Sequence, residues 1–494
     1  MSTLTATESG SSRLRAADAV LALAVVLPLA AIIAPYRHVH LPQTFILAVA
    51  ILGGLYCFKL AIDDAEQLIF VFLLYIPFQK VLPGDFGGAA RAANFTNAFL
   101  LLLSFGWLMR PKNLQGVWRA GRWGAFDAVV VLFLAILTVS MAAQALRETD
   151  EMRYETLSDL KRWLTPVAVY FLIRGIGITE RTAKKMLLAV IVTTSVIGLL
   201  GVKQFWLDMG GGSRHSLEEI RIEVTSGPSN LGAFFAYYLP YIVAVWLGNF
   251  WRFAYWGLVI PLAWCMDALR ATFSRGAAVA FLAAVAAVVW RRSKGAFLVI
   301  VPITGILVYL NPISLPYSIF GRMTGTYRSE RPGENLTDKF DKSTQTRLVI
   351  WRGGWQMIRE SPVFGVGYGQ FPKEIGKYEP EVAGMDPHNN VLKVAAEMGI
   401  PTAILFLAVI GMCFWRGYRL YGRVEDPLLR AMILGYVGSV AGLFVANLFG
   451  SRLESEEITT QFWAMTAAVT LISWRQPNQA EGATGAEGEH VDAQ

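Results

Sequence analysis

The chain has 494 residues, of which 54% are hydrophobic and only 16% are charged, and its mean hydropathy is +0.44. A soluble domain carries about 25% charged residues, so this composition excludes an ordinary soluble enzyme. The formal net charge of +7 does not indicate a nucleic-acid-binding protein, because the basic residues gather in short segments between apolar runs, where they set membrane topology.

Apolar runs of about 17–22 residues recur along the chain, each long enough to cross a hydrocarbon core of about 30 Å. They are continuous rather than alternating, which favours helices over a transmembrane barrel. The predicted fold is an all-α polytopic membrane protein with about 12–14 transmembrane helices. The expected spans are 17–35, 43–61, 67–83, 93–109, 125–144, 161–175, 185–205, 229–248, 253–269, 274–290, 295–311, 389–415, 428–449 and 458–474. The third and sixth are short enough to be half-spans.

The first run follows Arg13 and Arg15 and is longer than the apolar core of a signal peptide, so we expect a retained span. The three cysteines, Cys57, Cys265 and Cys413, all lie in apolar runs. They are interpreted as small hydrophobic residues, not as a disulfide or metal framework.

Four short segments are strongly basic: 110–122, 179–185, 291–294 and 416–423. The expected spans place all four on one side, which the positive-inside rule assigns to the cytoplasm together with both termini. The predicted organisation is then a cytoplasmic tail (1–16), eleven helices (17–311), a large periplasmic loop (312–388), three helices (389–474) and a disordered cytoplasmic tail (475–494). The expected location is a bacterial inner membrane with the active site on the periplasmic side.

The large loop has the length at which a loop is usually functional. Its segment "RGGWQMIRESP" predicts a helix that ends before Pro362. The following "GVGYGQF" (365–371) is interpreted as backbone turns. A nucleotide loop is disfavoured because no strand precedes it and no GK[ST] ending follows.

Several arginines are candidates for binding an anion on the outer side. Arg275 lies at the turn between the ninth and tenth spans, where it either snorkels to the surface or binds a ligand in a cavity. Arg270 has helical i,i+3 spacing to Asp267, which favours a structural ion pair. Arg347 and Arg352 lie in an apolar helical pattern of the large loop, and arginine in a partly desolvated crevice is well suited to phosphate.

His388 is the candidate general base, because a neutral imidazole accepts a proton near neutral pH. It stands in "PHNNVLKVAAEMGIP" before an apolar run, so a helix-cap role for this segment, through Asp386 or Asn389, is the alternative. No second histidine or carboxylate pair stands at ligand spacing, so no metal site is predicted. Glu397 lies further along the same span and is expected to be functional or paired.

The order of "GPSNLGAFFAYYLP", "SRGAAVAFLA", "TRLVIWRGGWQMIRESPVFGVGYGQF" and "PHNNVLKVAAEMGIP" resembles the O-antigen ligase and O-antigen polymerase superfamily over roughly residues 185–450. The resemblance implies transfer of a glycan from an undecaprenyl-diphosphate carrier to an acceptor at the outer leaflet, by a fold similar to other multi-helix lipid-carrier glycosyltransferases. It implies no cofactor and no metal, with Arg275 and Arg347 holding the diphosphate and His388 as base. Asn230, Asn389 and Glu397 are supporting candidates. The acidic segment "SRLESEE" (451–457) has no counterpart in the family pattern.

The implied partners are the lipid-linked donor, a glycan, lipid A-core or protein acceptor, membrane lipid and other polysaccharide-assembly proteins. The motifs do not separate polymerase from ligase, although no segment is dedicated to a lipid acceptor, which favours a polymerase of surface polysaccharide. A flippase or transporter of lipid-linked oligosaccharide is the alternative from another class, but such proteins carry their charges in a central cavity between repeats. A membrane scaffold without chemistry is a third interpretation.

Overall fold

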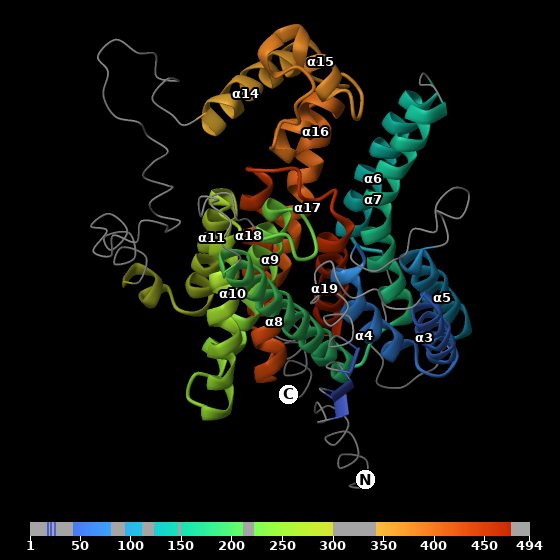
Figure 1. The fold of residues 1–494 in the computed structure, drawn as a ribbon, viewed down its shortest axis with the longest axis vertical. Coiled ribbons are helices and arrows are strands. Elements are labelled where there is room, and N and C mark those ends of the chain that lie inside the picture. The colour runs from blue at the N-terminus through green and yellow to red at the C-terminus, as the bar shows by residue number, and fades with distance from the viewer. Residues whose placement is uncertain are drawn as a thin grey trace, which may run out of the picture.

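The computed structural model describes residues 43–80, 94–110, 123–146, 150–210, 222–299 and 342–475, together with parts of 17–25. Every long regular element in these ranges is a helix (Figure 1). The helices are α3 (Gln43–Asp63), α4 (Ala65–Tyr75), α5 (Phe95–Met109), α6 (Ala125–Ala145), α7 (Asp150–Ile176), α8 (Glu180–Gly210), α9 (Pro228–Gly248), α10 (Val259–Ala271), α11 (Arg275–Arg292), α14 (Lys342–Glu360), α15 (Phe371–Tyr378), α16 (Asn390–Met398), α17 (Ile400–Leu420), α18 (Pro427–Asn447) and α19 (Glu456–Arg475), with 3-10 turns η1 (Ile76–Phe78), η3 (Phe253–Leu258) and η5 (Pro380–Val382).

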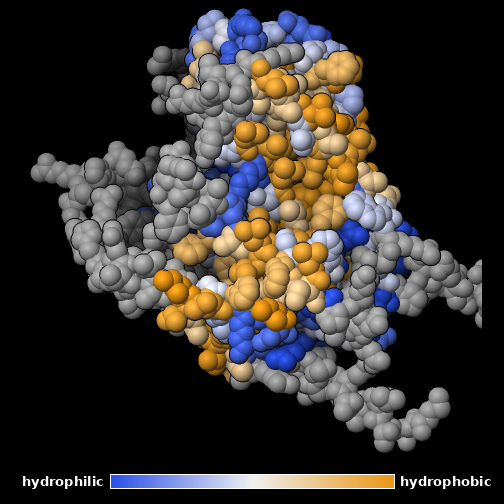
Figure 2. Space-filling model, turned by 90° about the vertical axis from the view of Figure 1, so that its right-hand side faces the viewer, coloured by the Kyte–Doolittle hydropathy of each residue, from blue (hydrophilic) through white to orange (hydrophobic). Residues whose placement is uncertain are grey.

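The chain is an all-α polytopic membrane protein. Five helices in the described ranges are long and apolar enough to cross a bilayer: Ala125–Ala145, Glu180–Leu207, Pro228–Gly248, Ile400–Leu420 and Pro427–Asn447. Figure 2 shows hydrophobic side chains over the middle of one face, with hydrophilic side chains gathered at its upper and lower ends. Most of the expected first span, the end of the eleventh, the first part of the large loop and both tails lie outside the described residues.

The centre of the bundle is built on small residues of α18. A Cβ on Gly435 would stand 2.7 Å from Tyr241 of α9, and one on Gly438 would stand 2.6 Å from Val288 of α11. Close approach of backbones is how helices associate in a membrane, where lipid is as apolar as a side chain. The glycines of α18 therefore let α9 and α11 pack directly against it.

The described residues of the four basic segments, with Arg110 alone from the first, lie at one end of this bundle. Arg110 and the backbone of Thr179 both contact Glu66. Lys184 forms an ion pair of 2.7 Å with Asp426, which follows the fourth basic segment. Arg291 donates a hydrogen bond of 2.7 Å to the carbonyl oxygen of Tyr418. The prediction that these segments share one side agrees with these contacts.

The predicted span 389–415 is wrong as a single helix. It is divided at Gly399, which has φ +85° and on which a Cβ would stand 2.0 Å from the carbonyl oxygen of Val363. Only glycine fits this conformation and this close approach. The short α16 precedes the break and the membrane-crossing α17 follows it, so Glu397 lies in α16 and not within a long continuous span.

The described part of the large loop is helical, and α14, α15 and α16 form a cap above α17 (Figure 1). The prediction of a helix ending before Pro362 is confirmed, because α14 ends at Glu360. The prediction of backbone turns in 365–371 is also confirmed, because all three of its glycines have positive φ. This segment crosses the break between α16 and α17, where Gly367 N donates a hydrogen bond of 2.9 Å to Glu397 O.

Candidate active site

The candidate site lies at the end of the bundle opposite the basic segments. Three distant parts of the chain meet there: the start of α16, the segment 448–455 after α18, and the start of α9. The helix α14 lies over them, and Trp351 Nε1 donates a hydrogen bond of 3.0 Å to the carbonyl oxygen of Pro387. This hydrogen bond attaches the turn that contains His388 to α14.

Each polar residue of the turn 386–390 has a different role. Asp386 Oδ1 accepts a hydrogen bond of 2.8 Å from His388 N, which is the pattern of an Asx turn. His388 has φ +51°, a left-handed conformation that is uncommon for a residue with a Cβ and that often marks a functional site. Its side chain is 47% exposed, so the imidazole is accessible.

Asn389 is the N-cap of α16 and accepts hydrogen bonds from the backbone of Val391 (3.0 Å) and Leu392 (3.1 Å). Asn389 therefore supplies the helix cap that was the alternative role for this segment. Asn390 is fully buried and donates a hydrogen bond of 2.7 Å to Asn447 Oδ1 at the end of α18. Asn389 caps the helix and Asn390 forms the buried hydrogen bond, so neither role falls to His388. The His388 ring is exposed instead.

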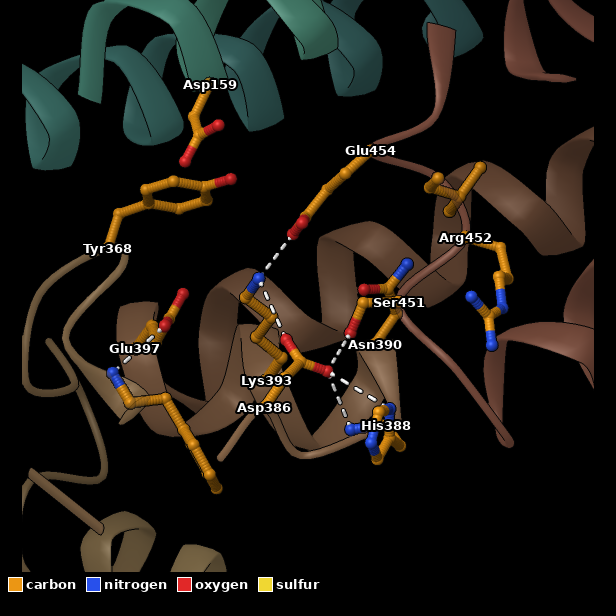
Figure 3. A network of polar contacts seen from close by, with 12 residues as sticks. Asp159, Tyr368, Asp386, His388, Asn390, Lys393, Glu397, Ser451, Arg452 and Glu454 are labelled. Carbon is orange, nitrogen blue, oxygen red and sulfur yellow. Dashed lines mark hydrogen bonds and ion pairs between the residues drawn. The ribbon is translucent and has the colours of Figure 1, made fainter. Parts of the chain in front are cut away.

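Two arginines act on the imidazole of His388. Partial burial lowers the pKa of His388, and the positive charges of Arg347 and Arg452 lower it further against the opposing effect of Asp386. The ring is therefore neutral at neutral pH and able to accept a proton. Arg347 comes from α14 and Arg452 from the segment after α18, so the charges that act on His388 come from two other segments of the chain. Figure 3 shows Arg452 and His388.

Arg347 and Arg452 also act on each other. Burial lowers the pKa of Arg452, and repulsion from Arg347 lowers it further, although Tyr237 and Asp386 oppose the shift. A guanidinium remains charged under such conditions. Two guanidinium groups whose charges act on each other in a partly buried place favour the binding of an anion.

Arg452 was not predicted from the sequence. It donates a hydrogen bond to Asn230 Oδ1, and Asn230 Nδ2 donates one of 3.2 Å to Ser455 Oγ. Asn230 thus orients the guanidinium of Arg452 from the start of α9. A basic residue in a short loop that the sequence predicts on the outer side departs from the positive-inside rule, and that departure was the available sequence signal.

The other predicted arginines have different surroundings. Arg270 pairs with Asp267 at 2.7 Å and stacks over the ring of Phe205 at 4.9 Å. The fork of Arg352 binds both oxygens of Glu379 at 2.6 and 2.8 Å. Arg275 begins α11, and the adjacent Gly276 lies against Phe449, where a Cβ would stand 2.6 Å from its side chain. Arg275 is therefore close in the fold to the segment that carries Arg452.

Glu397 anchors the glycine-rich segment. Its Oε1 accepts a hydrogen bond of 3.1 Å from Phe371 N, and Tyr368 OH in the same segment accepts one of 2.9 Å from Trp163 of α7. Burial raises the pKa of Glu397 to about 7, although Lys393 opposes the shift. Glu397 thus connects the glycine-rich segment 365–371 to α16.

The residues described by the structure contain no group of three or more His, Cys, Asp or Glu side chains that could hold a metal ion. The three cysteines are buried.

Residues 260–407 match the family model described as O-antigen ligase. This match supports the resemblance of the chain to the O-antigen ligase and O-antigen polymerase superfamily. This O-antigen ligase domain contains Arg275, Arg347 and His388, whereas Asn230 and Arg452 lie outside the matched residues. A search of curated proteins found no match. The family indicates an enzyme of the glycan ligase or polymerase type, with a lipid-linked glycan donor and a glycan acceptor in general.

Proposed function

We propose that this O-antigen ligase-family protein transfers a glycan from an undecaprenyl-diphosphate-linked donor to an acceptor hydroxyl at the outer face of the bacterial inner membrane. The observation that supports the proposal is the convergence of the segments that carry His388, Arg347 and Arg452, where the charges of both arginines act on the imidazole. A neutral base beside two cations is the arrangement that transfer from a diphosphate requires.

The donor already has a good leaving group, so the enzyme must stabilise the charge that develops on the diphosphate. Arg347 and Arg452 would bind its oxygens, with Arg275 at the start of α11 as a third cation. Preorganised guanidinium groups can take the place of a divalent cation here. Arg270 and Arg352 are left out of this proposal, because each is engaged with a carboxylate.

His388 would remove the proton from the acceptor hydroxyl. Its lowered pKa keeps the imidazole neutral, and its exposed side chain can reach an acceptor that arrives from outside. Direct attack of the acceptor oxygen on the anomeric carbon, with departure of the diphosphate, inverts the configuration in one step. The mechanism needs no metal.

Of the two reactions, we prefer polymerisation of a surface polysaccharide. Ligation of the glycan to lipid A-core or protein is the alternative reaction. Both reactions use the same donor and the same base. Deletion of the gene separates them: unpolymerised single repeats indicate a polymerase, and long chains left on the carrier indicate a ligase.

The direct test is transfer by the purified protein, supplied with a defined undecaprenyl-diphosphate-linked glycan and candidate acceptors. We expect inverted product from the wild type, no product from His388→Ala, and no loss of activity in the presence of a chelator. Movement of the donor across a membrane without formation of a glycosidic bond would instead support a flippase. Loss of activity with EDTA that a divalent ion restores would refute the metal-independent mechanism.

A further inference from the structure

Asp386 faces the imidazole that the proposed function uses as a base. Its Oδ1 lies 3.7 Å from His388 Nδ1 and accepts hydrogen bonds from His388 N (2.8 Å) and Ser451 Oγ (2.9 Å). Figure 3 shows the carboxylate between the ring of His388 and the ammonium group of Lys393. One side chain thus binds the backbone of the histidine and approaches its ring.

The carboxylate is held from its other side as well. Lys393 Nζ lies 3.4 Å from Asp386 Oδ2 and 2.6 Å from Glu454 Oε1 (Figure 3). Burial alone would raise the pKa of Asp386, but Lys393 and the hydrogen bonds from His388 and Ser451 together lower it. Asp386 is therefore a fixed, ionised group, and the ammonium group of Lys393 lies between its carboxylate and that of Glu454.

The positive charges around His388 oppose its protonation, and the carboxylate of Asp386 favours it. The charges of Arg347 in α14 and Arg452 after α18 both act on the imidazole, and Lys393 of α16 lies on the other side of Asp386. When the imidazole accepts a proton it becomes a third cation beside the two arginines. Asp386 supplies the negative charge that makes this change feasible.

We propose that Asp386 is a positioning residue for His388, whose carboxylate orients the imidazole and stabilises the imidazolium formed during transfer. This inference rests on the proposed function. In the step, the acceptor O–H bond breaks and its proton moves to Nε2 of His388. The acceptor oxygen bonds to the anomeric carbon while the bond to the diphosphate oxygen breaks, and its electron pair leaves with the diphosphate. Asp386 stays ionised, and the proton on His388 later passes to water.

The separation of 3.7 Å between Nδ1 and Oδ1 is too long for a hydrogen bond. Contacts of this kind are often long in structures without substrate and shorten in the complex. A charge on the ring would favour that shortening, since an opposite charge within about 4–6 Å stabilises the ionised form.

The decisive experiment is the pH profile of kcat for Asp386→Asn at saturating donor. The asparagine keeps an oxygen for His388 N and Ser451 but has no charge. We expect the rate at the plateau to fall about 10–100-fold, because a weaker base is less effective. The acidic limb should move to lower pH by about one unit, because the charge that raised the pKa of the imidazole is gone.

Asp267→Asn is the matched control. Asp267 also contacts a cation, and its side chain is 31% exposed, against 34% for Asp386. This variant should leave both the rate and the acidic limb unchanged. Asp386→Glu retains the charge and should keep the limb near the wild-type position with a partly restored rate.

A lower rate with an unmoved limb in Asp386→Asn would overturn the inference, since a structural role alone has that effect. Should Asp386→Asn fail to fold, Asp386→Ser takes its place, because a serine hydroxyl can still close the turn but carries no charge. The proposed function has its own test. A wild-type protein without transfer activity, or a fully active His388→Ala, would reject the proposed function and with it the role of Asp386.

Discussion

Asn390 donates a hydrogen bond of 2.7 Å to Asn447, which fixes the start of α16 to the end of α18. The same oxygen of Asn447 accepts hydrogen bonds from the backbone nitrogens of Arg452 (3.0 Å) and Leu453 (3.2 Å). Its nitrogen donates to the hydroxyl of Tyr237 in α9 at 2.7 Å. One buried amide therefore aligns the segments that carry His388 and Arg452.

Replacing Asn447 with alanine should destabilise the protein and disorder the site. Each buried polar group left without a partner costs about 1–3 kcal/mol. Asn390, Tyr237 and the backbone nitrogens of Arg452 and Leu453 each lose one. We expect a lower melting temperature in detergent and transfer activity reduced more than the stability loss alone explains. The matched control is Asn249→Ala, since Asn249 is 5% exposed and its side chain donates a local hydrogen bond to Val245 O at the end of α9. Equal effects in both variants would contradict the role of Asn447.

The sequence predicted the features that local chemistry controls. The turn between α10 and α11 is short because almost no polar residues separate the two apolar runs, and α14 ends before Pro362 because proline disfavours helix in the residue preceding it. The i,i+3 spacing of Asp267 and Arg270 predicted their ion pair, and that pair is confirmed. These features depend on neighbours within a few residues.

The features that were missed depend on contacts between distant segments. The break at Gly399 was overlooked because the apolar run continues through it, although Gly399 and Pro401 together were a warning. Arg452 was overlooked because it stands among acids in a short loop, and its partner Asn230 is 222 residues earlier in the chain. The roles of His388, Arg275 and Arg347 in transfer remain predictions.

Arg347→Ala and Arg452→Ala should each reduce kcat/KM for the donor by about 100–1,000-fold, the loss expected when a charge-stabilising donor is removed from the transition state. Both should also move the acidic limb of the pH profile to higher pH, because each arginine lowers the pKa of His388. The measurement is steady-state transfer across a range of pH.

Arg352→Ala is the control for these two arginine variants, because Arg352 is exposed and bound to Glu379. It should remain within about threefold of the wild type, as expected for a surface ion pair. Activity in Arg452→Ala equal to that of Arg352→Ala would remove Arg452 from the proposed diphosphate site.

Transfer by the wild-type protein should remain active into mildly acidic conditions. The base must be neutral, so activity is lost as the pH falls through the pKa of His388. That pKa is lowered from its ordinary value of 6.5 by burial and by the two arginines. The midpoint of the acidic limb of kcat/KM should therefore lie below 6.5, and a midpoint above that value would contradict the proposed surroundings of the base.

The two ends of the bundle should face opposite sides of the membrane. Glu381 is exposed in the cap near His388, and Glu425 is exposed beside the fourth basic segment. The native cysteines are buried, with Cys57 at 7%, Cys265 at 0% and Cys413 at 2% exposure, so a membrane-impermeant maleimide should label them little. In intact spheroplasts we expect Glu381→Cys to react with this reagent and Glu425→Cys to react only after the membrane is opened, because the basic segments remain in the cytoplasm. Labelling of Glu425→Cys alone would place the imidazole and its arginines on the cytoplasmic side, where they could not act on a donor presented at the outer leaflet.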